Sequence, residues 1–244
     1  MIAAAHPVQR PPRAKLLVVD ARRRIGHAPR SAFVRFLRRG DLVVANDAAT
    51  MPASLSGTHA ATGAAVEVRL AGRPSLGPED VGRFSAVVFG AGDFRTRTED
   101  RPAPPALAAG DRLALGPLRA TVERTLGHPR LVSLAFEGPP DEVWAGLASH
   151  GRPIQYAHVR VPLALWDVWT RIAGPPVAFE PPSAGFTLDW RALAAMREAG
   201  VEFATITHAA GISSTGDDEL DRLLPFDEPY RIPASTARAV SRAR

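Results

Sequence analysis

Five short apolar segments follow one another between residues 59 and 140, with turn residues between them and no helical pattern. Short strands at this spacing pair with their neighbours in the sequence and close into a barrel or a sandwich. The stretch from Pro102 to Gly110, rich in Pro and Gly, is expected to be a loop inside that unit. The apolar segments are residues 65–70, 85–89, 112–115, 120–124 and 131–136.

The two ends of the chain carry a different pattern, in which apolar strands alternate with helices. We therefore expect an α/β domain built from residues 1–58 and 141–244, with a small β-barrel domain, residues 59–140, inserted into it. The whole chain would then be α+β. The expected strands of the α/β part are 16–20, 42–45 and 201–207, and its expected helices are 31–39, 141–150 and 188–199.

Positive charge is concentrated near the N-terminus. Residues 1–40 contain nine Arg and Lys15 against the single acid Asp20, whereas the whole chain carries a net charge of only +5. Such asymmetry fits an anionic partner, for which the backbone of a nucleic acid is the obvious candidate. The alternative is an Arg-rich composition that leaves a solvated basic face, and charge alone does not decide between the two.

Composition excludes several classes of protein. The chain contains no cysteine, which rules out disulfides, thiolate metal sites and cysteine nucleophiles. Its seven histidines show no metal-ligand spacing, so no metal is expected. No apolar run approaches the ~18 residues of a membrane span, and the first 30 residues lack a signal-peptide core. We expect a cytoplasmic protein without a membrane partner; nothing in the sequence indicates its oligomeric state.

An ordered set of short motifs matches the characteristic strings of one enzyme family. Residues 41–55, DLVVANDAATMPASL, are similar to GDLLVFNDTRVIPARL. Further matches, in a consistent order over about 220 residues, are residues 13–17 with SRLL, 63–70 (GAAVEVRL) with GGKVEVLL, 180–185 (EPPSAG) with AAPTAG, 206–208 (ITH) with VTLH, and 228–233 (EPYRIP) with EYYEIP. In this set the chain resembles the S-adenosylmethionine:tRNA ribosyltransferase-isomerases of queuosine biosynthesis.

The resemblance implies a reaction in which S-adenosylmethionine is a co-substrate that donates its ribosyl group. The acceptor would be 7-aminomethyl-7-deazaguanine in a tRNA, whose exocyclic amine is the nucleophile. Adenine and methionine would leave, and an epoxycyclopentanediol group would form on the base. Because the sulfonium acidifies the neighbouring C5′ proton, such a site needs a general base and must exclude water. The tRNA would bind through the basic N-terminal region.

Three residues are candidates for catalysis. His208 closes an apolar strand and could act as a base or an acid near neutral pH, although a strand-end histidine is often structural. Asp47 follows another apolar strand, where sites of α/β sheets are usually found, but Asn-Asp is also a common self-satisfying turn. Glu228 belongs to a Pro-rich loop that the resemblance places near the site. The sequence leaves open which of the three is the base.

Further residues are candidates for binding the co-substrate. Asn46 offers both a donor and an acceptor, suited to a base edge or an amino-acid group. A tight turn made by Pro182, Ser183, Ala184 and Gly185 precedes a helix, so its amides could receive the carboxylate of methionine. Tyr230 accompanies Glu228 in the Pro-rich loop. Glu67 alternates with Val66 and Val68, and is expected to be solvated or to face a cleft.

Several positions depart from the family strings, which makes the chain a diverged member. Gly185 is followed by Phe186, where the family has LHF, and the family string MHSEY corresponds to residues 225–229, PFDEP. The two arginines of RVIPAR are replaced by Ala49 and Ser54. The sequence also ends at Arg244, where family members continue, so we expect a C-terminally short member. Two alternatives therefore stay open: a diverged enzyme acting on a small-molecule acceptor, and a non-catalytic protein that binds a ligand or tRNA.

Overall fold

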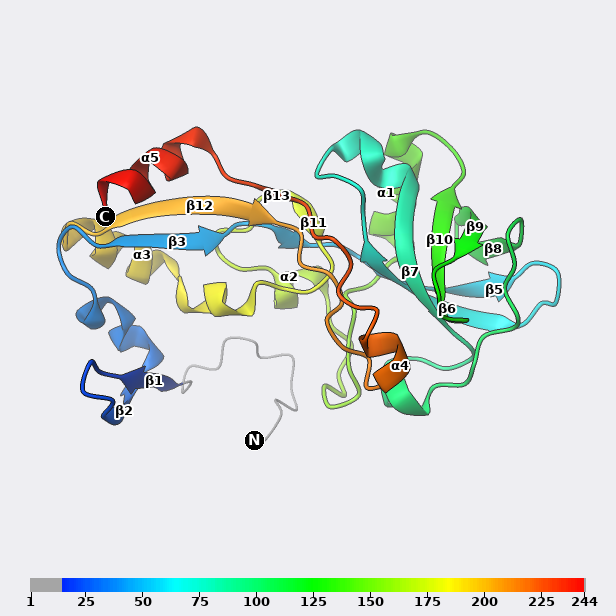
Figure 1. Cartoon of the computed structure of the whole chain (residues 1–244), viewed down its shortest axis with the longest axis horizontal. Coiled ribbons are helices and arrows are strands. Elements are labelled where there is room, and N and C mark those ends of the chain that lie inside the picture. Colours follow the sequence, from blue (N-terminus) through cyan, green and yellow to red (C-terminus); the bar gives the residue numbers. More distant parts are fainter. Residues whose placement is uncertain (1–14, 244) are drawn as a thin grey trace.

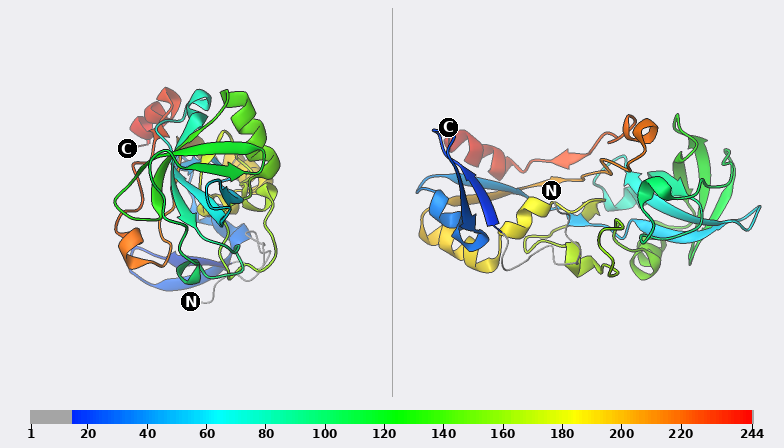
Figure 2. Two further views of the ribbon diagram at one scale, coloured as in Figure 1. Left: turned by 90° about the vertical axis from the view of Figure 1, so that its right-hand side faces the viewer. Right: turned by 90° about the horizontal axis from the view of Figure 1, so that it is seen from below.

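The computed structural model describes residues 15–243 and shows an elongated molecule with two parts (Figure 1). A β-barrel lies at one end of the long axis, and a small open sheet with helices on both faces lies at the other. The first and the last elements of the described chain, β1 (Lys15–Val19) and α5 (Ala234–Arg242), both lie at the end of the open sheet, as the second view of Figure 2 also shows. The expected α+β architecture, with a barrel inserted into an α/β part, is confirmed.

The barrel is closed and consists of six antiparallel strands in the order β10-β7-β6-β5-β8-β9. Its interior is filled by apolar side chains from alternate strand positions, which is how a small barrel buries its core. Each of the five segments expected to be strands forms one of them. The barrel strands are β5 (Ser54–His59), β6 (Ala65–Gly72), β7 (Arg83–Phe89), β8 (Arg112–Leu115), β9 (Leu118–Thr125) and β10 (Leu131–Phe136).

Strand β5 was not expected, and it moves the start of the barrel. It begins at Ser54, so the barrel starts before the boundary expected at residue 59. Its sequence, SLSGTH, lacks the alternation of apolar side chains that predicts a strand, in part because Gly57 carries no side chain. A Cβ on Gly57 would lie 2.0 Å from the carbonyl oxygen of Ala114 in β8, so close strand approach requires glycine here. The division of the chain into separate domains stays a prediction.

The open sheet joins the two ends of the chain. Strand β3 (Leu42–Asn46) pairs in parallel with β12 (Glu202–His208), and β13 (Tyr230–Arg231) pairs antiparallel on the other side of β12. Helix α3 (Trp190–Glu198) packs below this sheet, and α5 (Ala234–Arg242) lies above it (Figure 1). The other elements outside the barrel are β1 (Lys15–Val19), β2 (Ile25–Pro29), β4 (Ala49–Thr50), β11 (Pro176–Ala178), α1 (Pro140–His150), α2 (Leu165–Val168) and α4 (Asp218–Asp221).

The helix expected over residues 31–39 is shorter and tighter than its pattern indicated. It is a 3-10 helix, η1 (Arg30–Phe36), with no side chain capping its first turn and an extended backbone at Leu37. Short 3-10 segments of this kind are common connectors, and Phe33 and Val34 still pack under the sheet against Leu188, Met196 and Val201. Within residues 15–243, no helix combines the length and the apolar character needed to cross a membrane.

One apolar core runs from the barrel into the segments that lead to the open sheet. Phe179, which follows β11, is buried and packs edge-on against Phe84 of β7, with ring centroids 6.1 Å apart. Met51, Ile212 and Leu220 belong to the same core. Because these residues come from three separate connections, the packing fixes the barrel relative to the open sheet.

Glu67 is not solvated, although it is one of the residues that line a cavity of about 350 Å³. Its side chain is buried in the barrel wall between two buried guanidinium groups, accepting hydrogen bonds from Arg69 (2.8 Å) and Arg101. Burial opposes ionisation of this carboxyl, yet the two arginines hold its pKa below the ordinary value. The alternation of Glu67 with Val66 and Val68 does not distinguish a buried face of the strand from a solvent-exposed one, because all three residues are buried.

Replacing Phe179 by alanine tests the shared core. We expect Phe179→Ala to lower the free energy of unfolding by about 3–5 kcal/mol, since it removes a buried aromatic ring and leaves a cavity. Urea denaturation with an unchanged m-value measures the loss. Trp190→Ala is the control, because Trp190 is 67% exposed and its removal should change stability by at most about 0.5 kcal/mol. Equal effects of the two substitutions would contradict a shared core.

Candidate active site

Asn46 joins the carboxyl ends of the two parallel strands. It is the last residue of β3, and its amide nitrogen donates to the carbonyl of His208, the last residue of β12, at 2.9 Å. Its Oδ1 accepts from the backbone N–H of His208 and of Ala48, both at 3.0 Å. The Asn46 side chain therefore links β3 to β12 at the end of their backbone hydrogen-bond ladder. Among the described residues, the second amide hydrogen of Asn46 has no acceptor.

His208 and Glu228 form a pair at this edge of the sheet. His208 Nε2 lies 2.7 Å from Glu228 Oε2, and Glu228 Oε1 accepts from the backbone N–H of Gly211 at 2.6 Å. A histidine whose Nε2–H donates to a carboxylate keeps Nδ1 unprotonated and able to accept a proton. The side chains of His208 and Glu228 are 36% and 25% exposed, so a substrate can reach them.

Asp47 lies apart from the His208–Glu228 pair. Its Oδ1 accepts from the hydroxyl of Thr207 at 2.7 Å. Successive residues of a strand point to opposite faces, so Thr207 and Asp47 share one face of the sheet and His208 occupies the other. The three residues predicted for catalysis thus form two groups, one on each face.

The turn predicted to bind the co-substrate lies beside Asn46. Pro182, Ser183, Ala184 and Gly185 line a cavity of about 550 Å³ together with Asn46 and apolar side chains of β3, the edge strand of the open sheet. Gly185 N–H donates to the carbonyl of Pro182 at 2.9 Å, which closes the turn. Ser183 and Ala184 are exposed residues, and their backbone N–H groups donate to no acceptor in the described part of the chain.

Tyr230 does not line this cavity. It pairs with His208 across β13 and β12, and its side chain is 67% exposed. The structure therefore brings Asn46 together with the turn, and His208 together with Glu228, while Tyr230 stands beside the histidine without a hydrogen bond from its hydroxyl to any described residue.

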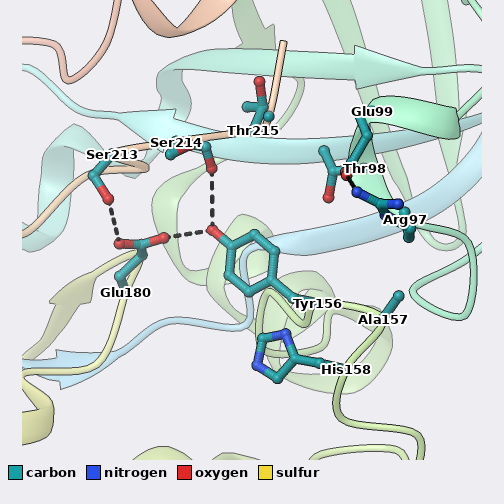
Figure 3. Close-up of a pocket in the computed structure, with 11 residues that line it drawn as sticks. Arg97, Thr98, Glu99, Tyr156, Ala157, His158, Glu180, Ser213, Ser214 and Thr215 are labelled. Atoms are coloured by element: carbon teal, nitrogen blue, oxygen red, sulfur yellow. Dashed lines mark hydrogen bonds and ion pairs between the residues drawn. The ribbon is translucent and has the colours of Figure 1, made fainter. Parts of the chain in front are cut away.

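A second cavity, of about 670 Å³, contains polar residues that the sequence did not single out (Figure 3). Tyr156 donates its hydroxyl proton to Glu180 at 2.5 Å, and Ser213 donates to the other carboxylate oxygen at 3.2 Å. Burial raises the pKa of Tyr156 well above its ordinary value, so the phenol stays protonated. The only sequence signal was position: Glu180 stands two residues before the Pro182 turn.

The acidic segment 217–221 supports one wall of this second cavity. Asp221 accepts hydrogen bonds from the Ser214 hydroxyl (2.7 Å) and from the backbone N–H groups of Thr215 (2.6 Å) and Gly216 (3.1 Å). These bonds hold the pKa of Asp221 below its ordinary value. Across residues 15–243, no group of three or more His, Cys, Asp or Glu side chains is placed to hold a metal ion.

Exchanging the amide of Asn46 for a carboxylate tests the link between the strands. We expect Asn46→Asp to lower the free energy of unfolding by about 1–3 kcal/mol at neutral pH, because an acceptor then faces the carbonyl of His208. The loss should shrink in acid, where the protonated carboxyl donates to that carbonyl. Thermal unfolding at several pH values measures it. Asp47→Asn is the reciprocal control, since it keeps an acceptor for Thr207, and equal losses in both variants would contradict the role of Asn46.

The whole chain matches a known family of proteins. The family model described as "Queuosine biosynthesis protein" matches residues 1–244. Relatives named S-adenosylmethionine:tRNA ribosyltransferase-isomerase are 31% identical in Sorangium cellulosum and 30% identical in Citrifermentans bemidjiense, with all of this chain and 68% of each relative covered. A relative of the same name in Moorella thermoacetica is 27% identical and is covered over 58% of its length, by 86% of this chain.

Among solved structures, the crystal structure of S-adenosylmethionine tRNA ribosyltransferase from Thermotoga maritima matches with 18% identity and a TM-score of 0.35, over 99% of this chain and 62% of that one. The chain thus spans about three fifths to two thirds of the length of these proteins. The family model covers every residue, and two relatives at 30% identity or more cover the whole chain. The chain belongs to the queuosine biosynthesis protein family.

Proposed function

We propose that this chain consumes S-adenosylmethionine as a ribosyl donor and modifies 7-aminomethyl-7-deazaguanine in tRNA, forming epoxyqueuosine and releasing adenine and methionine. Its relatives carry the name of that enzyme. The observation that carries the proposal is the meeting of Asn46 and the turn at 182–185 in one cavity, next to a strand end that bears a carboxylate-paired histidine. A tRNA-modifying enzyme of this kind would work in the cytoplasm.

The cavity beside β3 suits the co-substrate. Its volume of about 550 Å³ lies in the ordinary range for small-molecule sites. The exposed amides of Ser183 and Ala184 would receive the methionine carboxylate, and the remaining amide hydrogen of Asn46 would donate to a ligand oxygen or ring nitrogen. Leu16, Phe33 and Leu188 line the apolar side, where they exclude water from a reactive sulfonium.

His208 is the general base of this proposal. Glu228 accepts a hydrogen bond from the Nε2–H of His208, which leaves Nδ1 to take the C5′ proton that the sulfonium acidifies. Glu228 is itself fixed by the N–H of Gly211, so the imidazole is held in one orientation. Asp47 would position the strand end through Thr207, because it lies on the opposite face of the sheet from His208.

The tRNA would bind on the basic side of the open sheet. Arg22, Arg23 and Arg24 lie exposed at the turn between β1 and β2, where Asp20 accepts hydrogen bonds from the backbone of Arg22 and Arg24. A cavity of about 630 Å³ on the neighbouring η1 and α3 is lined by three more arginines, Arg30, Arg35 and Arg191. Residues 1–14, the rest of the predicted tRNA-binding region, lie outside the described residues.

Product release tests the reaction. Purified protein and S-adenosylmethionine would be incubated alone, with free 7-aminomethyl-7-deazaguanine, and with tRNA that carries this base, and adenine and methionine would be quantified by mass spectrometry. We expect release only with the tRNA. Release without tRNA would instead support a small-molecule acceptor, and no release from folded protein would support a non-catalytic binding protein.

Single substitutions in the same assay test the base. His208→Ala and Glu228→Gln should each lower turnover at least about tenfold, since general-base catalysis contributes at least that much. Circular dichroism would confirm that both variants fold. His128→Ala, whose imidazole only accepts from the nearby Arg130 N–H on the barrel, is the control and should keep full turnover. A larger loss in Asp47→Asn than in His208→Ala would assign the base to Asp47.

Salt dependence tests the tRNA surface. Replacing Arg22, Arg23 and Arg24 together by alanine should weaken tRNA binding and reduce the slope of log K against log salt by up to about one for each phosphate that an arginine no longer neutralises. Fluorescence anisotropy over a range of salt concentrations measures both. Arg119→Ala with Arg124→Ala, two exposed arginines on the barrel, is the matched control. Unchanged binding by the triple variant would show that these arginines form only a solvated face.

A further inference from the structure

The second cavity lies between the barrel and the open sheet, where three connections meet (Figure 3). Residues 97–99 reach it from the barrel, residues 156–158 and Glu180 form its floor and side, and residues 213–216 close it. Its volume of about 670 Å³ accommodates a bicyclic base with a substituent. None of the residues predicted from the sequence for catalysis or co-substrate binding lines it.

Hydrogen-bond acceptors dominate the inner end of this cavity. The carboxylate of Glu180 accepts from Tyr156 on Oε1 and from Ser213 on Oε2, and the carbonyl of Ser214 lies 3.5 Å from the Tyr156 hydroxyl. A carboxylate oxygen accepts more than one hydrogen bond, so both oxygens can still accept from a ligand. The site therefore favours a ligand that brings donors.

The charge of the cavity favours a cation. Glu180 has no cationic partner among the described residues, whereas Arg97 at the mouth is paired with Glu99. The buried Arg69 lies over the Tyr156 ring, with its guanidinium carbon 6.0 Å from the ring centroid, and it is paired with Glu67. A protonated amine on a ligand would supply the missing positive charge beside Glu180.

An exposed aromatic ring, that of His158, lines the same cavity as Glu180. The rings of Tyr156 and His158 are stacked, with centroids 6.1 Å apart and planes inclined by 6°. Tyr156 is half-buried and its orientation is fixed by the Glu180 hydrogen bond, while His158 is exposed. Unpaired RNA bases are commonly recognised by stacking on such aromatic side chains.

The cavity is directly connected to both groups of the candidate active site. Glu180 stands two residues before Pro182, which lines the cavity beside β3. On the other chain segment, Gly211 holds Glu228, the partner of His208, and Ser213 two residues later donates to Glu180. The chain segments that line this cavity therefore continue directly into the turn and into the residue that holds Glu228.

From these observations we infer that this cavity binds the acceptor base, with its protonated aminomethyl group against the Glu180 carboxylate and its ring stacked on the exposed ring of His158. The inference rests on the proposed function for the identity of the base. It assigns Glu180 as the residue that selects an amine-bearing base and His158 as one that binds the ring whatever its substituent.

Two free bases that differ only in the amine separate these roles. Isothermal titration calorimetry would measure the affinity of 7-aminomethyl-7-deazaguanine and of 7-methyl-7-deazaguanine for the wild-type protein, without S-adenosylmethionine. We expect the amine to increase affinity at least about tenfold. Glu180→Gln should abolish that preference while it keeps binding of the methyl base. His158→Ala should weaken both bases at least about fivefold and preserve their ratio, as loss of stacking predicts.

A matched carboxylate serves as control. Glu123 is half-buried on the barrel and also accepts a serine hydroxyl, from Ser133 at 2.8 Å, so Glu123→Gln should leave both affinities unchanged. A full preference for the amine in Glu180→Gln would overturn the inference, as would the absence of measurable binding of either base to the wild-type protein. If Glu180→Gln did not fold, a loss in His158→Ala that changed the ratio of the two affinities would overturn it.

The binding experiment and the release experiment fail independently. Release of adenine with the modified tRNA, combined with no preference for the amine by the wild-type protein, would keep the proposed function and reject this cavity as the base site. A preference that depends on Glu180, combined with no release, would keep the base site and reject the proposed reaction.

Discussion

The parallel pairing of β3 with β12 is the interaction on which the rest of the molecule depends. Asn46 and His208, 162 residues apart in the sequence, are joined through the Asn46 amide at the common end of these strands. Closing so long a loop costs conformational entropy, although the cost grows only slowly with length. The barrel and all other elements between β3 and β12 are therefore inserted between two neighbouring strands of one small sheet. The polar residues Asn46, Asp47 and His208 lie where the chain leaves β3 and where β12 ends.

The segment from 179 to 185 couples the packing of the molecule to its cavities. Phe179 is buried in the core shared with the barrel, Glu180 lines the second cavity, and Pro182 begins the turn beside β3. A backbone advances at most about 3.6 Å per residue, so the α-carbons of Glu180 and Pro182 are no more than about 7 Å apart. A short backbone segment that begins at the buried Phe179 thus links the two candidate ligand sites.

Local periodicity was enough to predict most of the fold. Five barrel strands, the helices at 140–150 and 190–198, and the strands ending at Asn46 and His208 all have clear apolar patterns. Strand β5 was not predicted, because the glycine at position 57 is required by a close backbone contact with Ala114, and such a contact leaves no pattern in the local sequence. Glu67, expected to be solvated or to face a cleft, is buried beside a cavity; its partner Arg69 is two residues away, but its second partner Arg101 is 34 residues away and only the barrel brings them together.

The candidate site was predictable only where residues end strands or form turns. Asn46, Asp47 and His208 have that signal, but their division between two faces follows from the hydrogen bond of Asp47 to Thr207, which depends on strand register. Glu180 had no such signal, since the family string reads alanine at that position, and its partners Tyr156 and Ser213 come from loops 24 and 33 residues away. A carboxylate without a cationic partner costs free energy when it is partly buried, unless a ligand compensates its charge. That cost is the physical reason to look for a cationic ligand in the second cavity. In the cavity beside β3, the groups without a hydrogen-bond partner among the described residues are backbone N–H and side-chain amide donors, which suit an anionic or neutral group of a ligand.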